Sequence, residues 1–309
     1  MTPPTLTAAI AALLEGVSRK DLGQRAGKLS SVYRDGGTSA GIATRADALA
    51  YLVTRCPATY AATRAAFARV TEAVPDFSPS GLLDVGAGPG TAAWAARDAW
   101  PSVDAITLIE PNAVFRDLAA RLLPDGEIIP GDLGVAKPSA DLVTASYVLA
   151  ELPEAAAAFI ARDLWGSATK MLVLVEPGTP AGFARIRAAR AALIAAGGHV
   201  AAPCTHDNTC PMAGNDWCHF SERLPRSREH MIAKGARVPF EDERYAYVAV
   251  SRASVMPPGF ARIIKPVVEN KPGITLPLCD ASGLRDQFIA RRDKDLIRSA
   301  RKKEWGDLF

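Results

Sequence analysis

The chain has 309 residues, of which 49% are hydrophobic and 22% are charged, with a formal net charge of +3. These values are ordinary for a globular protein of one or two domains, and the small net charge does not by itself indicate a nucleic-acid binder. No apolar run approaches the roughly 20 residues that a membrane span needs, which excludes an integral membrane protein of the helical kind. The apolar run at 8–14 lacks a preceding basic segment, so we expect a cytoplasmic protein with no secretory signal and no membrane partner.

The first two regions differ in their hydrophobic pattern. Residues 1–75 are rich in Ala, Leu and Arg, with a helical pattern, and residues 76–196 alternate short apolar runs with longer amphipathic ones. Continuous apolar strands alternating with helices predict an α/β fold with a doubly wound, Rossmann-like parallel sheet. The expected strands are 82–85, 105–109, 127–129, 142–149 and 171–175, and the expected helices are 90–99, 113–123, 154–164 and 180–196.

The last two regions are a Cys-rich segment and a C-terminal segment. Between 197 and 244 the periodicity disappears and Cys, His, Asn, Asp, Pro and Gly dominate, which indicates an insertion between the fifth helix and the sixth strand of the sheet. Residues 245–309 carry strand patterns at 245–251, 262–268 and 274–278, which we expect to complete the same sheet, followed by a charged helix and a basic tail.

A glycine turn after the first expected strand is the strongest local signal. A strand ends at Asp84, the glycines Gly86, Gly88 and Gly90 follow at alternate positions, and a helix begins. Glycines let the backbone turn sharply beside a ligand, and the helix N-terminus offers free N–H groups. The pattern resembles motif I of the class I S-adenosylmethionine-dependent methyltransferases, so we interpret 76–196 as an S-adenosylmethionine-binding core.

Two further strand ends carry acids that fit a bound adenosine. Glu110 ends the second strand, where a carboxylate can accept the ribose hydroxyls, a device that NAD-binding folds also use. Asp132 and Leu133 follow the third strand, where methyltransferases contact the adenine. A Rossmann-like domain that binds no ligand is the alternative.

No catalytic residue can be named from the sequence. The Asn/Asp-Pro-Pro-Tyr/Phe motif of base-amine methyltransferases is missing after the fourth strand, and no cysteine occurs between Cys56 and Cys204 to act as a nucleophile on cytosine C5. Tyr147 and Glu151 are pocket candidates, although a packed Tyr and a helix-capping Glu are the preferred interpretations. Catalysis is therefore left unassigned.

Four of the five cysteines form a candidate metal site. We interpret the fifth, Cys56, as a small hydrophobic residue of the core. All four histidines lie within or near the same segment, and the cysteine spacings lack the CxxC pairs typical of structural zinc. Irregular spacing suits an iron–sulfur cluster, which takes thiolates from whatever loops converge. Zinc and a set of unligated thiols are the alternatives. The candidate ligands are Cys204, Cys210, Cys218 and Cys279.

Two stretches concentrate basic residues, one at 19–34 and one at 285–303. Each is either a solvated helix face or a surface that faces RNA.

A wider resemblance joins these features. The Cys segment, its continuation at 223–230 and 240–247, the Glu-Pro-Gly-Thr-Pro run at 176–180, 29–34 and 305–307 together resemble methyltransferase-like assembly factors of the mitochondrial small ribosomal subunit and their bacterial relatives. This resemblance implies a [4Fe–4S] cluster on the four cysteines, a role in small-subunit maturation and contact with ribosomal RNA, with no DNA partner.

The resemblance leaves enzymatic turnover open. The first hypothesis is a methyltransferase-like protein acting on or with small-subunit ribosomal RNA. The alternatives are a non-catalytic ribosome-binding factor on the same fold, and a small-molecule methyltransferase with a zinc-stapled lid.

Overall fold

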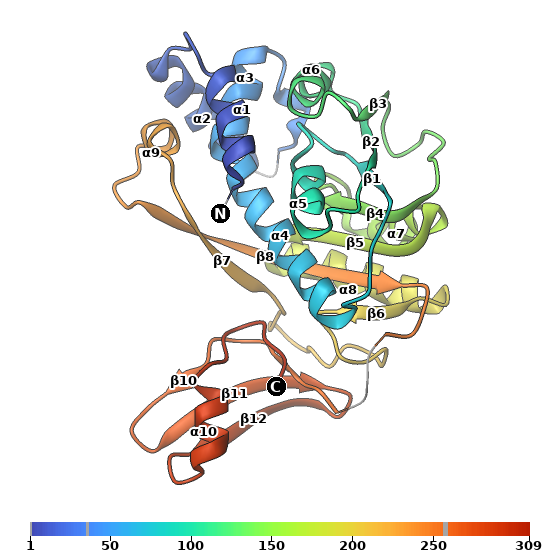
Figure 1. Ribbon diagram of the computed structural model, residues 1–309, viewed down its shortest axis with the longest axis vertical. Coiled ribbons are helices and arrows are strands. Elements are labelled where there is room, and N and C mark those ends of the chain that lie inside the picture. The colour runs from blue at the N-terminus through green and yellow to red at the C-terminus, as the bar shows by residue number, and fades with distance from the viewer. Residues whose placement is uncertain (1, 35–36, 256–258) are drawn as a thin grey trace.

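A computed structural model describes residues 2–34, 37–255 and 259–309, and its main feature is a central sheet (Figure 1). In the described chain this sheet has eight strands in the order β3-β2-β1-β4-β5-β8-β6, with β7 paired to β8 off that path. Strands β1 to β5 run parallel, whereas β8 is antiparallel to β5. The strands are β1 (Gly81–Val85), β2 (Ala105–Glu110), β3 (Glu127–Pro130), β4 (Ala140–Ser146), β5 (Ala168–Pro177), β6 (His199–Ala202), β7 (Phe220–Pro225) and β8 (Phe240–Ser251).

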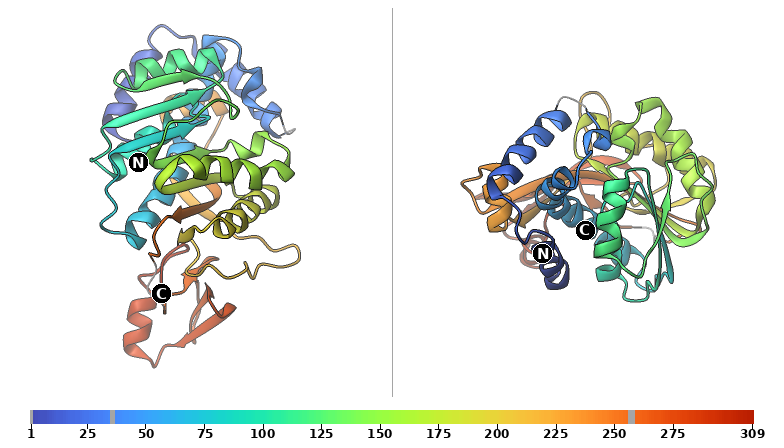
Figure 2. Two further views of the ribbon diagram at one scale, coloured as in Figure 1. Left: turned by 90° about the vertical axis from the view of Figure 1, so that its right-hand side faces the viewer. Right: turned by 90° about the horizontal axis from the view of Figure 1, so that it is seen from above.

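Helices cover both faces of this sheet (Figures 1 and 2). Alternate side chains of a strand point to opposite faces, so Val173 and Val175 of β5 join one core cluster while Leu172 and Leu174 join the other. The first cluster includes α4 (Cys56–Ala73), α5 (Thr91–Ala99) and α6 (Ala113–Leu122), and the second includes α7 (Ala157–Ser167) and α8 (Pro180–Ala195).

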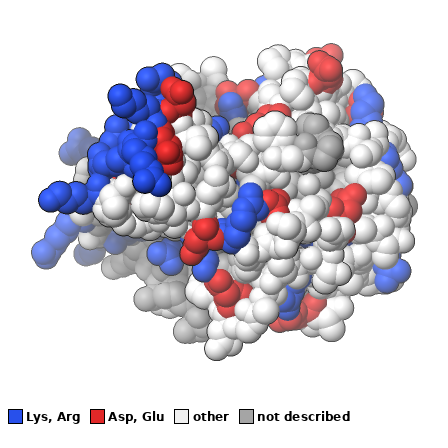
Figure 3. Space-filling view, turned by 90° about the horizontal axis from the view of Figure 1, so that it is seen from below, with Lys and Arg blue, Asp and Glu red and all other residues white. Residues whose placement is uncertain are grey.

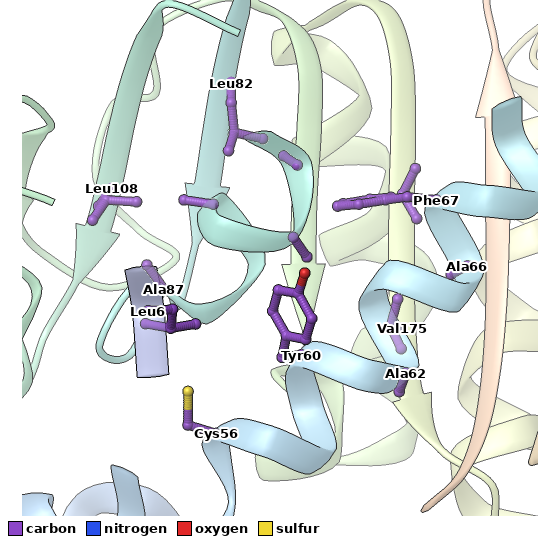
Figure 4. Packing of buried hydrophobic residues seen from close by; sticks show 14 of the residues in the cluster. Leu6, Cys56, Tyr60, Ala62, Ala66, Phe67, Leu82, Ala87, Leu108 and Val175 are labelled. Atoms are coloured by element: carbon purple, nitrogen blue, oxygen red, sulfur yellow. The ribbon is translucent and has the colours of Figure 1, made fainter. Parts of the chain in front are cut away.

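The N-terminal helices pack on the first of these faces. They are α1 (Pro4–Leu13), α2 (Arg19–Arg34) and α3 (Arg45–Thr54), with the 3-10 turn η1 (Ser39–Gly41) before α3. Figure 4 shows Tyr60 and Phe67 of α4 directed toward the sheet, with Cys56 at the start of that helix. Cys56 is buried in this core, which confirms it as a core residue. The side chains of Tyr33 and Arg34 lie outside the described residues.

The Cys-rich insertion begins one strand later than expected. Strand β6 precedes it and pairs with β8, so the insertion lies between the sixth and last strands of the sheet and not before the sixth. Strand β6 has only four residues and follows the pair Gly197-Gly198, which hides it from a periodicity analysis. The insertion itself contains β7 and α9 (Arg228–Lys234).

The C-terminal strands do not all complete the main sheet, contrary to expectation. Only β8 joins it, and the others form a second sheet of four strands among the described residues. In this sheet β12 pairs along one edge of β11, and β9 and β10 pair along the other edge. We call this unit the C-terminal module; it has its own core of buried aliphatic side chains and lies apart from the main sheet in Figure 1. It comprises β9 (Arg262–Ile263), β10 (Val268–Glu269), β11 (Gly273–Asp280), β12 (Gly283–Ala290) and α10 (Lys294–Ala300).

Two expected elements have other bounds than the pattern suggested. Strand β4 ends at Ser146, since the next residue, Tyr147, has a positive φ of 64° that a strand does not accommodate. The turns η2 (Leu149–Glu151) and η3 (Glu154–Ala156) follow, so α7 begins only at Ala157. Throughout the described ranges, no helix combines the length and apolar character needed to cross a membrane.

Candidate cofactor site and four-cysteine cavity

The motif I glycines form the turn that joins β1 to α5. Gly86, Gly88 and Gly90 have φ values of 68°, 56° and 83°, a region that side chains disfavour. A Cβ at Gly86 would lie 2.5 Å from the Val148 side chain, so this turn packs closely on the end of β4. At Gly88, in contrast, no described heavy atom lies within 4 Å of such a Cβ. Gly88 therefore faces open space, as a site approached by a ligand requires.

Glu110 lies directly beside this turn. Its carboxylate accepts hydrogen bonds from the backbone N–H groups of Gly88 and Asn112, both at 2.8 Å. Burial raises the pKa of Glu110, and these two donors oppose that effect. The structure thus brings the ends of β1 and β2 together as the sequence indicated.

The Asp84 carboxyl group is buried and incompletely hydrogen-bonded. It is 1% exposed, and its Oδ2 has no hydrogen-bond partner among the described residues. Burial, together with the nearby charge of Glu110, raises the pKa of Asp84 to about 8. A cationic ligand group would restore the ionised carboxylate, so the α-amino group of S-adenosylmethionine fits this residue chemically.

The loop after β3 borders the same region. The Gly131 N–H donates to the Glu110 carbonyl at 3.4 Å, which ties this loop to the end of β2. Asp132 is exposed, with its Oδ1 accepting the Gly134 N–H at 2.8 Å, and Leu133 is half-buried. Their contact with an adenine ring stays a prediction.

Tyr147, at the end of β4, is held by a partner that the sequence did not reveal. Its phenol donates to Glu243 Oε1 at 2.7 Å, and the Arg55 guanidinium lies 3.9 Å from the same carboxylate. Burial, followed by the Glu243 charge, raises the pKa of Tyr147 well above its usual value. Tyr147 is therefore a protonated hydrogen-bond donor at neutral pH and is unsuited to act as a base.

Glu151 binds the first residue of the 3-10 turn η1 in the N-terminal region. Its carboxylate accepts hydrogen bonds from the backbone N–H and the hydroxyl of Ser39, both at 2.9 Å. A few residues on, the Ile42 carbonyl accepts a bond from Asn112 Nδ2 at 2.8 Å. The segment 39–42 therefore connects the end of β4 to the end of β2, across the carboxyl edge of the sheet.

The four cysteines of the candidate metal site line one cavity, and they come from three parts of the chain. Cys204 follows β6, Cys210 and Cys218 lie in the insertion, and Cys279 belongs to β11. The rest of the lining is mostly apolar, with Phe183, Met212 and Ile264 among it. The expected convergence is present.

The spacing of these groups does not match a single metal ion. Within the described part of the chain, no three or more His, Cys, Asp or Glu side chains are placed to hold one. A tetrahedral zinc site with Zn–S bonds of about 2.3 Å requires sulfurs about 3.8 Å apart. The metal site on the four cysteines therefore stays a prediction, with the thiols lining one cavity.

Two buried guanidinium groups also line this cavity, and no sequence pattern pointed to them. Arg262, 1% exposed, donates to the Pro203 and Gly306 carbonyls and to Glu72, each at 2.8 Å. Arg190 donates to the His206 carbonyl at 2.6 Å. One nitrogen of each guanidinium is buried and finds no partner in the described chain. The cavity is therefore electropositive and suited to an anionic occupant.

Burial favours the protonated form of three of the thiols in this cavity. It is the first cause that raises the pKa of Cys204 and Cys218, and it raises that of Cys279 to about 12. A cation that replaced these protons would create thiolates beside Arg190 and Arg262. The donor set, the convergence and the guanidinium groups all fit a polynuclear, thiolate-bound centre.

The sheet order, with its reversed strand β8, and the glycine turn after β1 define a class I methyltransferase-like α/β protein. Solved methyltransferases resemble it at low identity. Magnesium protoporphyrin IX methyltransferase from Synechocystis matches with a TM-score of 0.42 and 13% identity, over 72% of this chain and 90% of that one. Mitomycin 7-O-methyltransferase matches with a TM-score of 0.39 and 19% identity, over 80% of this chain and 66% of that one.

The chain belongs to the family described as mitochondrial small ribosomal subunit Rsm22, which matches residues 45–309. It is 30% identical to the human mitochondrial ribosome assembly protein METTL17, over 84% of this chain and 62% of that protein. The mitochondrial Rsm22-cox11 tandem protein 2 of Schizosaccharomyces pombe is 26% identical over 74% of this chain and 38% of that protein. The chain therefore spans less than two thirds of either relative. Both relatives are mitochondrial by name, so the expected cytoplasmic location stays a prediction.

Proposed function

We propose that this protein is an S-adenosylmethionine-binding, cluster-bearing factor that assists assembly of the small ribosomal subunit through contact with its ribosomal RNA. Membership of the Rsm22 family supports the ribosomal role. The structural observation that carries it is a basic face on the C-terminal module. Figure 3, which views the molecule from below, shows Lys and Arg side chains gathered on that side.

The basic face combines cations with exposed apolar groups, as RNA-binding surfaces do. Phe288 is 55% exposed, and Leu284 and Leu296 are also exposed. Cations neutralise phosphates, and an exposed ring offers a stacking surface to an unpaired base. The basic residues are Arg285, Arg291, Arg292, Lys294, Arg298, Arg301, Lys302 and Lys303, beside the acids Asp286, Asp293 and Asp295.

In the other basic stretch, on α2, some of the cations form internal ion pairs. Arg25 contacts Asp21 at 2.8 Å and Asp47 at 2.6 Å, and Arg19 lies 3.7 Å from Glu229. Ion pairs also involve Arg285, Arg291, Arg298 and Arg301 of the C-terminal face. We prefer that face for ribosomal RNA because it carries more cations than α2 and an exposed aromatic ring, Phe288.

Co-sedimentation with small-subunit particles at rising salt tests this role. The wild type should co-sediment at low salt and dissociate steeply as salt rises, because phosphate contacts release counterions. A variant with Arg292, Lys294, Arg298 and Lys302 changed to Glu should lose binding, and a control with the exposed Lys20 and Lys28 of α2 changed to Glu should retain it. Equal binding by both variants would reject the C-terminal face.

We assign S-adenosylmethionine to the turn after β1. When bound, it supplies an electrophilic methyl group. Asp84 would hold its amino group, Glu110 its ribose and Gly88 would leave room for close approach, while the segment 39–42 limits access of water. Labelled S-adenosylmethionine should bind the wild type and not Asp84→Ala. Failure of both to bind would remove the cofactor from the proposal.

We assign a [4Fe–4S] cluster to the four cysteines. A cubane places each thiolate on its own iron, which suits four sulfurs spread around a cavity better than one zinc ion does. It would also staple β6, the insertion and β11 to one another. Protein purified without oxygen should be brown. Each of Cys204→Ser, Cys210→Ser, Cys218→Ser and Cys279→Ser should bleach it, whereas Cys56→Ala should keep the colour. A colourless protein with stoichiometric zinc would contradict this assignment.

A non-catalytic role is the second candidate, and Tyr147 favours it. The residue at the end of β4 is tied to Glu243 and protonated, so the chain presents no base there. Tight S-adenosylmethionine binding without methyl transfer to small-subunit precursors would establish a platform role. Transfer that survives Tyr147→Phe would instead show that the substrate needs no base from this position.

A further inference from the structure

A cavity of about 330 Å³ lies between α4 and β7, outside the motif I turn. Phe220 and Tyr247 line both this cavity and the four-cysteine cavity, so they form the wall between the two. Its volume falls in the range of sites that enclose small ligands, roughly 300–1,000 Å³. We call it the α4–β7 cavity.

Five aromatic rings line this cavity: Tyr60 and a cluster of four. Phe220, Tyr245, Tyr247 and Trp305 all line it. The Phe220 ring lies 6.0 Å from Tyr245, 5.4 Å from Tyr247 and 6.4 Å from Trp305, measured between ring centroids. Such a cluster lines the cavity with flat apolar surfaces, which suit the face of a nucleobase.

Two polar groups of this lining are buried and unsatisfied. Tyr247 is 2% exposed and its hydroxyl has no hydrogen-bond partner within the described chain, and the same holds for the buried Trp305 Nε1. Buried polar groups are normally paired, so these two indicate a ligand that carries hydrogen-bond acceptors. The edge of a nucleobase carries such acceptors.

Three guanidinium groups stand at the same cavity. Arg64, Arg69 and Arg223 line it together with a single carboxylate, Glu222. Each Arg also contacts an acid: Arg64 lies 2.6 Å from Asp98, Arg69 lies 2.8 Å from Asp307 and Arg223 lies 2.7 Å from Asp242. A guanidinium has five N–H donors, so each can bind an anion while keeping its acid. Burial raises the pKa of Glu222, and the described lining therefore carries three cations against one carboxyl group.

We propose that the α4–β7 cavity binds one unpaired nucleotide, with its base among the aromatic rings and its phosphate at the three arginines. This proposal rests on the proposed function for its source, an unpaired segment of ribosomal RNA. A free mononucleotide has the same chemistry and is the other source to be tested. Single-stranded RNA is commonly read by this combination of aromatic stacking and Arg.

The variants must leave the four-cysteine cavity intact, so Phe220 and Tyr247 are kept. Trp305→Leu removes one ring and one unsatisfied donor, and the double variant Arg64→Ala, Arg223→Ala removes a half-buried and an exposed cation. Arg121→Ala, an exposed Arg on α6 paired with Asp117, is the matched control. The visible absorption and the melting temperature of each variant report whether it remains folded.

The experiment uses the full chain with a fluorescent single-stranded RNA decamer, a duplex of the same sequence, and mononucleotides as competitors. Trp305→Leu should weaken decamer binding about tenfold with an unchanged salt slope, the double Arg variant should lower that slope, and Arg121→Ala should do neither. A thiouridine-containing decamer should crosslink to the peptide that contains Tyr245 or Trp305. Competition by mononucleotides at low concentration would identify a free nucleotide as the ligand.

Unchanged decamer binding by Trp305→Leu, or crosslinks confined to the C-terminal basic face, would overturn the nucleotide site. That result leaves the proposed function standing if the C-terminal charge variant still loses the particles. The converse outcome is a protein that binds the decamer through Trp305 and does not bind small-subunit particles. That result would uphold the nucleotide site and reject the ribosomal role.

Discussion

Asp84→Asn separates the stability of the cofactor site from its function. Burial holds the pKa of Asp84 at about 8, against 3.8 for the free side chain. The folded protein therefore keeps a proton that the unfolded chain releases above about pH 4. The contribution of this group to stability is complete below the unfolded pKa and is lost as pH rises toward 8, so the wild type should lose stability across that window.

The size of the effect follows from the shift. One pKa unit corresponds to about 1.4 kcal/mol, so at pH 7 the buried carboxyl costs the folded state about 4 kcal/mol relative to acid conditions. Asn is a neutral replacement of the same shape and avoids this penalty. We expect Asp84→Asn to raise the melting temperature of the cofactor-free protein by roughly 5–10 °C near pH 7 and by little near pH 4.

Calorimetry of the two proteins at about pH 5, 7 and 9, with Asp104→Asn as an exposed control, measures this difference. The same variant should bind S-adenosylmethionine roughly 10- to 100-fold more weakly, since it lacks the charge that pairs with the amino group. Gain of stability with loss of binding is the expected signature. Destabilisation at every pH, or unchanged binding, would refute the assignment of Asp84.

Three other expectations test neighbouring parts of the account. Gly90→Ala should destabilise by about 2 kcal/mol or more, because its φ is 83° and its Cβ would lie 2.5 Å from Leu123; Gly197→Ala, with φ 80° and open space, should lose only about 1 kcal/mol in chemical denaturation. Glu151→Ala should free the segment 39–42, which would show as faster hydrogen exchange in that segment and faster release of S-adenosylmethionine. Unchanged exchange would contradict the role of Glu151 in holding this segment. Arg262→Met should lower the free energy of unfolding by about 3 kcal/mol and speed proteolysis of the C-terminal module, whereas equal proteolysis would show that Arg262 does not anchor it.

The core of the fold could be predicted because its strands and turns are encoded by short local sequence patterns. Apolar runs such as 82–85 and 105–109 coincide with β1 and β2, and the glycines after Asp84 require their positive φ values. The acid at the end of β2 lies beside that turn for a topological reason, since parallel neighbouring strands end at the same edge.

What the sequence concealed depends on contacts between distant residues. Tyr147 and Glu243 are 96 positions apart, and nothing near either one indicates their hydrogen bond. Arg190 and Arg262 carry no motif, because burial of an Arg is decided by the tertiary structure around it. The second sheet was missed for a similar reason, since strand patterns at 262–268 and 274–278 do not say which sheet they join.

Depletion of this protein in the cell that produces it tests the central claim most directly. Sucrose-gradient profiles and RNA analysis should show precursors of the small ribosomal subunit accumulating while large subunits form normally, with rescue by the wild type and not by Cys204→Ser. A normal small-subunit profile after complete depletion would contradict the role in assembly.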